Sequence, residues 1–230
     1  MATLIAQITD THLLGDPDAC LRGIPSRAHL IHVLEDVATH QPDWYLFTGD
    51  IADRGEPAAY EQFEALTTGL PKGVVPGNHD HPDRWRDPQV LEVGGWRMLL
   101  LSSVYPQSLC GEGRLSGGSL AWLTNQLACF TQPTVIALHH PPVPVGIDWV
   151  DQMGLANAAE LWQVIGGHDQ VKLILFGHIH HAFATVYQGV TCYGTPSSHS
   201  QLQAPRDPGY RLLWLEAGGE HRTEVVFLQS

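Results

Sequence analysis

Residues 73–80 have the sequence Gly-Val-Val-Pro-Gly-Asn-His-Asp. Gly73–Pro76 predicts a short buried strand, and the turn Gly77-Asn78-His79-Asp80 follows it directly. Taken alone, this turn needs no function, because Gly, Asn and Asp are common turn residues. It also brings together an amide oxygen that could bind a metal, an imidazole that could face what the metal holds, and a carboxylate, Asp80, that could orient that imidazole.

Four other polar clusters each follow a predicted strand. They are Asp10-Thr11-His12, Gly49-Asp50 with Asp53, His139-His140, and Gly177-His178-Ile179-His180. In open α/β folds, ligands gather beyond the carboxyl ends of strands, so clusters far apart in sequence can converge on one site. Residues two apart in an extended chain point to the same side, which suits the D-x-H and H-x-H pairs to metal binding. Carboxylate and neutral imidazole are ligands for zinc, iron or manganese.

Each of these clusters also has a plain structural interpretation. A D-x-H sequence is commonly a surface turn with a helix cap, and an H-x-H sequence is commonly an exposed strand edge. Gly49-Asp50 could simply reverse the chain, with Asp53 and Arg54 shaping the loop that follows. The clusters indicate a metal site only when they are considered together.

The rest of the chain alternates strands with helices and then changes to strands alone. The predicted strands are Thr3–Thr9, Trp44–Thr48, Gly73–Pro76, Arg97–Val104, Thr134–Leu138, Lys172–Phe176, Ala182–Val190, Thr191–Tyr193, Tyr210–Glu216 and Thr223–Leu228. The predicted helices are Ser26–His40 with Ser26 as its N-cap, Pro57–Thr68, a helix from Ser116 or Ser119 to Cys129, and Ala156–Ile165. We expect the last strands to pair antiparallel. This order predicts one α/β (α+β) domain over residues 1–230, with two packed β-sheets flanked by helices.

The charge balance excludes several partners. The chain of 230 residues carries 24 acids against 12 Lys and Arg, a formal charge of −12, which argues against a nucleic-acid polymer or an anionic membrane as partner. No apolar run reaches the ~20 residues that span a bilayer. The four cysteines are widely spaced, which predicts free thiols and a reducing, cytoplasmic location. Histidine, with 14 residues, outnumbers Lys and Arg together, so the placement of histidines matters most.

The ordered series D-x-H, G-D-x-x-D, G-N-H-D, H and G-H-x-H, each after a strand, resembles the calcineurin-like metallophosphoesterase superfamily. The resemblance covers Asp10–His180 and implies a four-layer αββα sandwich with a two-metal centre. It implies one metal held by Asp10, His12, Asp50 and His180, and a second held by Asp50, Asn78, His139 and His178, with Asp50 bridging. It implies that His79 is catalytic and contacts the phosphate and leaving group, with Asp80 supporting it. The ions would be divalent or mixed-valence iron, manganese or zinc.

Further stretches resemble one branch of this superfamily. Gln7–His12 with Gly23, Leu115–Leu123 and Thr195–Ser198 look like class III cyclic-nucleotide phosphodiesterases, and Trp149–Gln152 with Leu155, Asn157 and Glu160-Leu161 is similar to bacterial cyclic-AMP phosphodiesterases. This branch implies hydrolysis of a small anionic phosphodiester, 3′,5′-cyclic AMP to 5′-AMP, by in-line attack of a metal-bridging hydroxide. Asn78 and His79 would contact the substrate. For His140, two interpretations are equally open: it contacts the substrate or supports the site, or it has a purely structural role.

Several alternatives stay open at this point. The enzyme could be a broad-specificity phosphodiesterase or a glycerophosphodiesterase, or the chain could be a non-catalytic scaffold with the same fold, although every ligand position is filled. The candidates for contacting a nucleobase are chosen by position only; they are Tyr105, Trp149, His199 and the loop of residues 140–145. Packing under a loop is an equally good reason for these side chains. A homodimer is also open.

Overall fold

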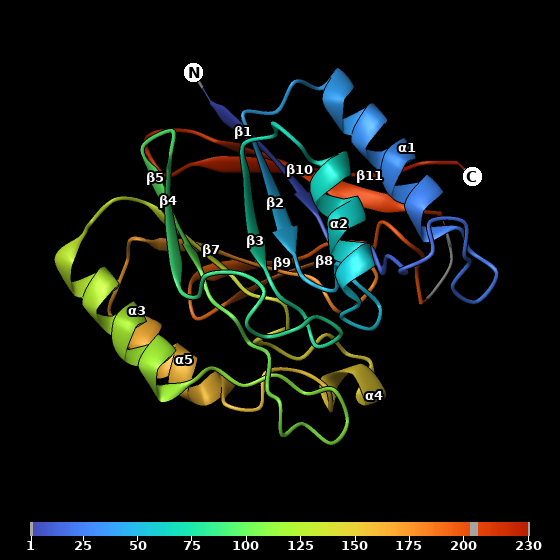
Figure 1. The fold of residues 1–230 in the computed structure, drawn as a ribbon. Helices are drawn as coiled ribbons and strands as arrows, with labels where there is room; N and C mark the ends of the chain where they lie inside the picture. Colours follow the sequence, from blue (N-terminus) through green and yellow to red (C-terminus); the bar gives the residue numbers. More distant parts are fainter. Residues whose placement is uncertain (1, 203–206, 230) are drawn as a thin grey trace.

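The computed structural model describes residues 2–202 and 207–229, and its strands form two sheets (Figure 1). The five-stranded sheet has the order β11-β10-β1-β2-β3, formed by β11 (His221–Phe227), β10 (Gly209–Leu215), β1 (Thr3–Ile8), β2 (Trp44–Thr48) and β3 (Lys72–Val75). The six-stranded sheet has the order β4-β5-β6-β7-β9-β8, formed by β4 (Gln89–Val93), β5 (Trp96–Leu100), β6 (Thr134–Ala137), β7 (Val171–Phe176), β9 (Val190–Gly194) and β8 (Phe183–Tyr187).

Three apolar clusters define the layers. The middle cluster joins the two sheets and includes Ile5 and Leu46 from one sheet with Leu173 from the other. A second cluster packs the outer face of the five-stranded sheet against α1 (Ser26–Thr39) and α2 (Pro57–Leu66). A third packs the other sheet against α3 (Gly117–Cys129) and α5 (Ala158–Ile165). The predicted αββα sandwich is confirmed (Figure 1).

The strand β1 shows why the apolar pattern of this fold is nearly continuous. Ile5 packs between the sheets, whereas its neighbours Ala6 and Ile8 pack under the helices. A strand buried on both faces has no need of alternating polar residues.

Parallel pairing places the functional segments at one edge. The strands β1, β2 and β3 run parallel, as do β5, β6, β7 and β9, so their carboxyl ends lie together within each sheet. Asp10, Asp50 and Asn78 follow the strands of the first sheet, and His139 and His178 follow those of the second. The site therefore draws on both sheets.

Several details differ from the prediction. The strands near residue 190 divide at a tight turn, because Gln188 and Gly189 both have positive φ (48° and 83°), so Val190 begins β9 instead of ending β8. The strand β9 pairs antiparallel with β8 as expected, but parallel with β7. The predicted strand Arg97–Val104 ends at Leu100. The strand β4 and the short helix α4 (Asp148–Asp151) are not predicted from the sequence.

The predicted N-cap of the first helix is also wrong. Pro25 occupies the cap position, and Ser26 is the first helical residue. Its hydroxyl instead contacts Nδ1 of His199 at 3.2 Å. The third helix, predicted to begin at Ser116 or Ser119, begins at Gly117, and Ser116 is its cap, since its side chain accepts a hydrogen bond from the Ser119 amide.

The described part of the chain contains no helix long and apolar enough to cross a membrane. The four cysteines are free thiols, as predicted; three are exposed and Cys192 is buried.

Candidate metal centre

The backbone turns sharply at the nominated ligands. Five of them have positive φ angles, a region that residues other than glycine rarely adopt: Asp10 (53°), His12 (45°), Asp50 (51°), His178 (69°) and His180 (46°). Strained backbone of this kind persists where the surrounding fold enforces it, commonly at functional sites. Here it turns the side chains that follow β1, β2 and β7 toward a common point.

Glycines next to the ligands allow the chain segments to approach. A Cβ atom at Gly77 would overlap both the carboxylate and the backbone amide of Asp50. A Cβ at Gly177 would overlap the Thr9 hydroxyl and lie 2.8 Å from Oδ2 of Asp10. The Gly-Asn and Gly-His sequences are therefore required by close packing as well as by turning.

One group of ligand atoms is formed by Asp10, His12 and His180. Nε2 of His180 lies 3.1 Å from Oδ1 of Asp10 and 3.2 Å from Nε2 of His12. All three side chains are almost fully buried, so no bulk water surrounds their polar atoms. Three donors from two strand ends thus face one another across a short gap.

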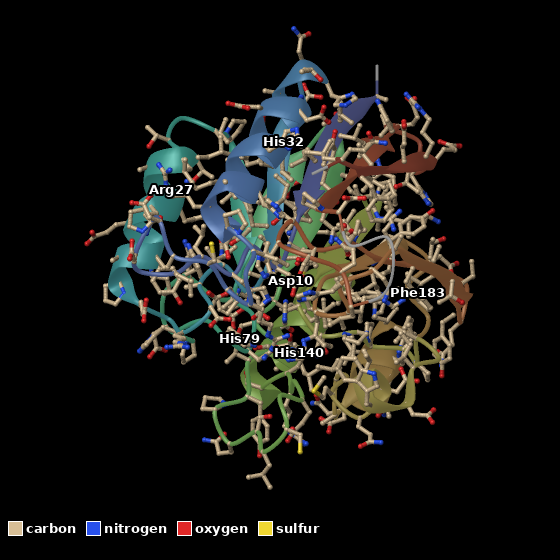
Figure 2. All side chains as sticks on the ribbon, turned by 90° about the vertical axis from the view of Figure 1, so that its right-hand side faces the viewer. Asp10, Arg27, His32, His79, His140 and Phe183 are labelled. Carbon is tan, nitrogen blue, oxygen red and sulfur yellow. The ribbon has the colours of Figure 1, made fainter. Side chains whose placement is uncertain are left out.

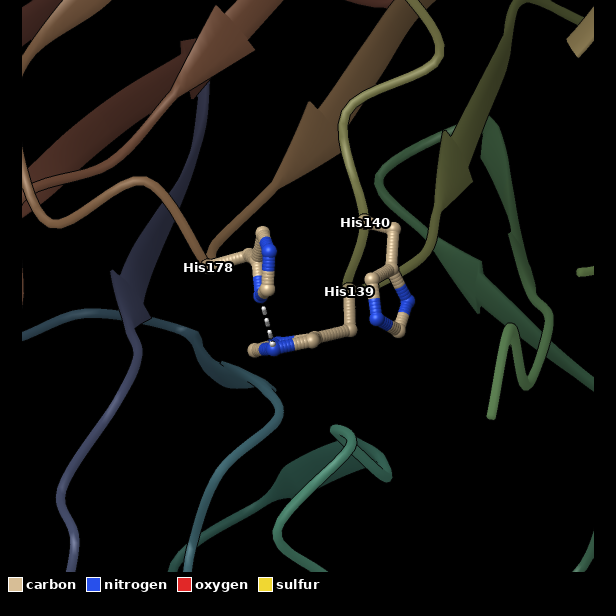
Figure 3. Close-up of side chains that lie close together, drawn as sticks. All are labelled: His139, His140 and His178. Atoms are coloured by element: carbon tan, nitrogen blue, oxygen red, sulfur yellow. Dashed lines mark hydrogen bonds between the residues drawn. The ribbon is translucent and has the colours of Figure 1, made fainter. Parts of the chain in front are cut away.

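A second group surrounds His139. Its Nε2 lies 3.2 Å from Oδ1 of Asn78, 3.4 Å from Oδ2 of Asp50 and 3.3 Å from Nδ1 of His178 (Figure 3). The same Asp50 oxygen lies 3.8 Å from Nε2 of His12, which belongs to the first group. All seven residues predicted as ligands are brought together, with Asp50 between the two groups.

Hydrogen bonds behind the rings set which nitrogen faces inward. Nδ1 of His139 donates to the Thr48 carbonyl at 2.7 Å, and Nδ1 of His180 donates to the Ser200 carbonyl at 2.8 Å. In a neutral imidazole, the inward Nε2 then carries the lone pair that a metal requires. On His12, Nδ1 faces the Asp53 carboxylate at 3.3 Å, which orients that ring in the same sense.

The donor set fits a cation. Oδ1 of Asp10 is buried and accepts no hydrogen bond within the described ranges, although lone pairs and carboxylates converge around it. Burial, the largest single influence, raises the pKa of Asp10, but the nearby His180 and His139 together outweigh it and lower the pKa to about 2. Burial is also the largest single influence on His139 and lowers its pKa, but Asp50, Asp10 and the Thr48 carbonyl together outweigh it and raise that pKa to about 9. The carboxylates therefore attract positive charge to this point, and metal ions would supply it.

His79 lies at the open side of these groups. Its ring is 4.9 Å from that of His12, and its side chain is 41% exposed. Nδ1 donates to the Asp53 carbonyl at 2.7 Å, which leaves Nε2 directed away from the backbone and free to meet a ligand. Its backbone amide donates to Oδ1 of Asp50.

Asp80 occupies a different place from the one predicted. Its carboxylate accepts the backbone amides of Ile51, Ala52 and Gly77, together with the Tyr60 hydroxyl. It therefore anchors the loop that follows Asp50, while the His79 ring is oriented by Asp53. Burial, with the nearby Asp50 charge, raises the pKa of Asp80 to about 6.

His140 is fully buried and both of its ring nitrogens have protein partners. The ring packs against the rings of His139 and His178 (Figure 3). Burial holds its pKa well below the usual range, so the ring is neutral. The structure thus encloses this ring in protein, in contact with two of the predicted ligands.

The stretches that resembled one branch of the superfamily contact one another. The Thr195 hydroxyl donates to the Gln7 side chain at 2.7 Å, and the Ser197 hydroxyl donates to the Asp10 carbonyl at 2.9 Å. These bonds brace the strand end that carries Asp10 and His12. In the other stretch, Asp151 accepts the backbone amides of residues 145 and 146, and the Asn157 side chain bonds the backbone of Leu115 in both directions.

Some contributors could not be found from the sequence. The Thr48 and Ser200 carbonyls orient two ligand rings, but a backbone carbonyl carries no residue-type signal. The sequence indicates Asp53 only as a loop residue, because its contacts with the rings of His12 and His79 depend on the fold. Of the candidates for holding a base, the buried His199 ring lies 5.8 Å from that of His12, whereas Trp149 on α4 is 51% exposed.

The comparison with protein families decides the class. The model of the calcineurin-like phosphoesterase family matches residues 3–182, which contain every predicted ligand. The chain belongs to the calcineurin-like phosphoesterase family. It is 38% identical to a probable cyclic nucleotide phosphodiesterase of Synechococcus, over 100% of this chain and 94% of that protein. It is 35% identical to the 3′,5′-cyclic adenosine monophosphate phosphodiesterase CpdA of Escherichia coli K12, over 96% and 88%.

Solved structures agree on the fold. A dimetal phosphatase from Danio rerio superposes with a TM-score of 0.70 at 15% identity, over 93% of each chain. Identity at this level supports the shared architecture of this family member and no more.

Proposed function

We propose that this family member is a dinuclear-metal phosphodiesterase that hydrolyses 3′,5′-cyclic AMP to 5′-AMP. The observation that carries the proposal is the single Asp50 oxygen between two groups of buried ligands, with the exposed His79 ring beside them. One carboxylate shared by two ligand sets is the arrangement that a pair of metals needs. Asp10, His12 and His180 would hold one ion with Asp50, and Asn78, His139 and His178 would hold the other.

The metals and the protein side chains would have different roles in the reaction. When bound, two divalent ions would activate a water molecule and neutralise charge on the phosphoryl group. The Asn78 amide and the His79 ring add fixed polar groups where charge develops. His79, held by Asp53 through Nδ1, presents Nε2 to the leaving oxygen and protonates it. The Asp53 carboxylate also lies 3.6 Å from the same Nδ1, on the side of the ring away from the leaving oxygen.

The substrate assignment rests on the relatives and on charge. The named relatives are cyclic nucleotide phosphodiesterases, aligned over nearly their whole length. Because the chain has a net charge of −12, positive charge at the metal site must attract the anionic substrate.

A substrate panel on metal-reconstituted protein tests this proposal. Cyclic AMP, cyclic GMP, 2′,3′-cyclic nucleotides, glycerophosphodiesters and phosphomonoesters would be compared by kcat/KM, with product identity established by chromatography. We expect the highest value for cyclic AMP, with 5′-AMP as product. A preference for monoesters or glycerophosphodiesters would reject the substrate, and no turnover of any diester by fully loaded protein would favour a non-catalytic scaffold.

A further inference from the structure

The loop of residues 105–112, here called the flanking loop, is closed on itself. The Glu112 carboxylate accepts the Ser108 hydroxyl at 2.7 Å and the Cys110 amide at 3.0 Å, and the Ser108 amide donates to the Tyr105 carbonyl. Its base is closed by the Arg114 amide on the Ser103 carbonyl. In Figure 2 this loop projects beneath the labelled His79 and His140.

One hydrogen bond joins this loop to the body of the protein. Nε2 of His140 donates to the Gly111 carbonyl at 3.0 Å. Within residues 2–202 and 207–229, no other hydrogen bond or ion pair links residues 105–112 to a residue outside them. Directly after the loop, Gly113 is held by hydrogen bonds to Gly154 and Ala156. The bond from His140 therefore fixes the part of the loop that precedes this anchor.

The loop borders the metal centre at Asn78. Gly111 has φ +95°, and a Cβ atom built there would lie 3.7 Å from Nδ2 of Asn78 and 3.7 Å from Sδ of Met153. Two residues later, a Cβ at Gly113 would overlap the His140 ring. The chain therefore passes directly between the buried ring and a residue assigned to the metal site.

The other side of the His140 ring is fixed by the site itself. The ring centroid lies 4.9 Å from that of His139 at 87°, and 4.7 Å from that of His178 at 46° (Figure 3). A carbonyl can only accept, so Nε2 carries the hydrogen, and Nδ1 accepts from the Ser103 hydroxyl at 2.8 Å. Ser103 thus fixes the tautomer that bonds Gly111.

We propose that His140 is a positioning residue that holds the flanking loop beside Asn78, where the loop forms one wall of the substrate site. Residues 105–112 contain no Lys or Arg and one acid, so this wall does not suit a phosphate. It faces the nucleoside part of the substrate instead. The identity of that part rests on the proposed function, whereas the bond between His140 and the loop does not.

The first experiment measures the loop without substrate. Amide hydrogen exchange over residues 105–113 would be compared in wild type, His140→Ala, His140→Gln and Ser103→Ala, with metal content determined for each. We expect exchange about ten-fold faster in His140→Ala, because the buried bond is lost. His140→Gln keeps an amide donor and should remain near wild type, while Ser103→Ala, which releases the tautomer, should be intermediate.

The second experiment tests whether the flanking loop contacts the substrate, by comparing KM with phosphate inhibition. In metal-loaded His140→Ala, KM for the cyclic nucleotide should rise about ten-fold, while inhibition by inorganic phosphate should keep its wild-type constant. Equal exchange rates in His140→Ala and wild type would refute the positioning role. If the loop of His140→Gln exchanged as fast as that of His140→Ala, the hydrogen bond would have no role and the ring would only fill space. A loosened loop with unchanged KM would refute the wall. If the wild-type protein had no diesterase activity, the proposed function would be rejected. The hydrogen-exchange comparison would still test the positioning role of His140.

Discussion

Replacement of His79 by Ala separates chemistry from stability. The ring is 41% exposed, and its one side-chain hydrogen bond, to the Asp53 carbonyl, is worth ~0.5–1.5 kcal/mol of folding free energy. Its loss should therefore leave the fold and the seven ligand positions intact. If Nε2 protonates the leaving oxygen, kcat should fall ~10²–10⁴-fold, which is ~2.7–5.4 kcal/mol in the activation free energy.

The assay compares two leaving groups on metal-loaded protein. Cyclic AMP expels an alkoxide that needs a proton, whereas bis(4-nitrophenyl) phosphate expels a stable phenolate that does not. The loss in kcat should therefore be large for cyclic AMP and at least ten-fold smaller for the nitrophenyl ester. His81→Ala is a matched control, because His81 is an exposed histidine two positions further on, and its kinetics should match wild type.

Three outcomes would contradict this reasoning. Full activity of His79→Ala on cyclic AMP would remove the residue from the mechanism. An equal loss with both esters would show that the ring does not act as an acid toward the leaving group. A loss of bound metal would show that the ring acts through the centre instead.

Other predictions concern the centre itself. Asp50→Ala should abolish binding of a metal pair, measured by elemental analysis, and two ions per chain in this variant would disprove the bridging role. Gly77→Ala should lower metal affinity ~10–100-fold, because its Cβ would displace Asp50, while Gly117→Ala, with open space around its Cα, should bind metal normally. In metal-free protein, the pKa of Asp10 is about 2 against an ordinary 3.8. Its contribution to stability is present above pH 3.8 and lost as pH falls through 2, so urea unfolding of Asp10→Asn should depend less on pH in that window.

Local sequence was enough to recognise much of this protein. The apolar runs and turn residues predicted most of the strands and helices, because strands buried on both faces need continuous apolar residues. The D-x-H, G-N-H-D and G-H-x-H motifs indicated the ligands, because metal donors are few in type and their spacing at a strand end is short-range. The tight turn at Gln188-Gly189 is less evident from the sequence, because Gln at a position with positive φ is a weaker turn signal than Asn or Asp.

Tertiary structure decided how the ligands work together. Seven residues spread over some 170 positions meet because parallel strands of two sheets end at a common edge, which no local pattern contains. The structure also showed which groups contact the supporting residues: Asp53 rather than Asp80 bonds the His79 ring, and His140 bonds the Gly111 carbonyl of a loop. Side-chain type determines which chemistry is available, but the partners of each polar atom depend on long-range packing. The sequence therefore indicated the candidate metal ligands, and the fold determined which of their atoms face one another.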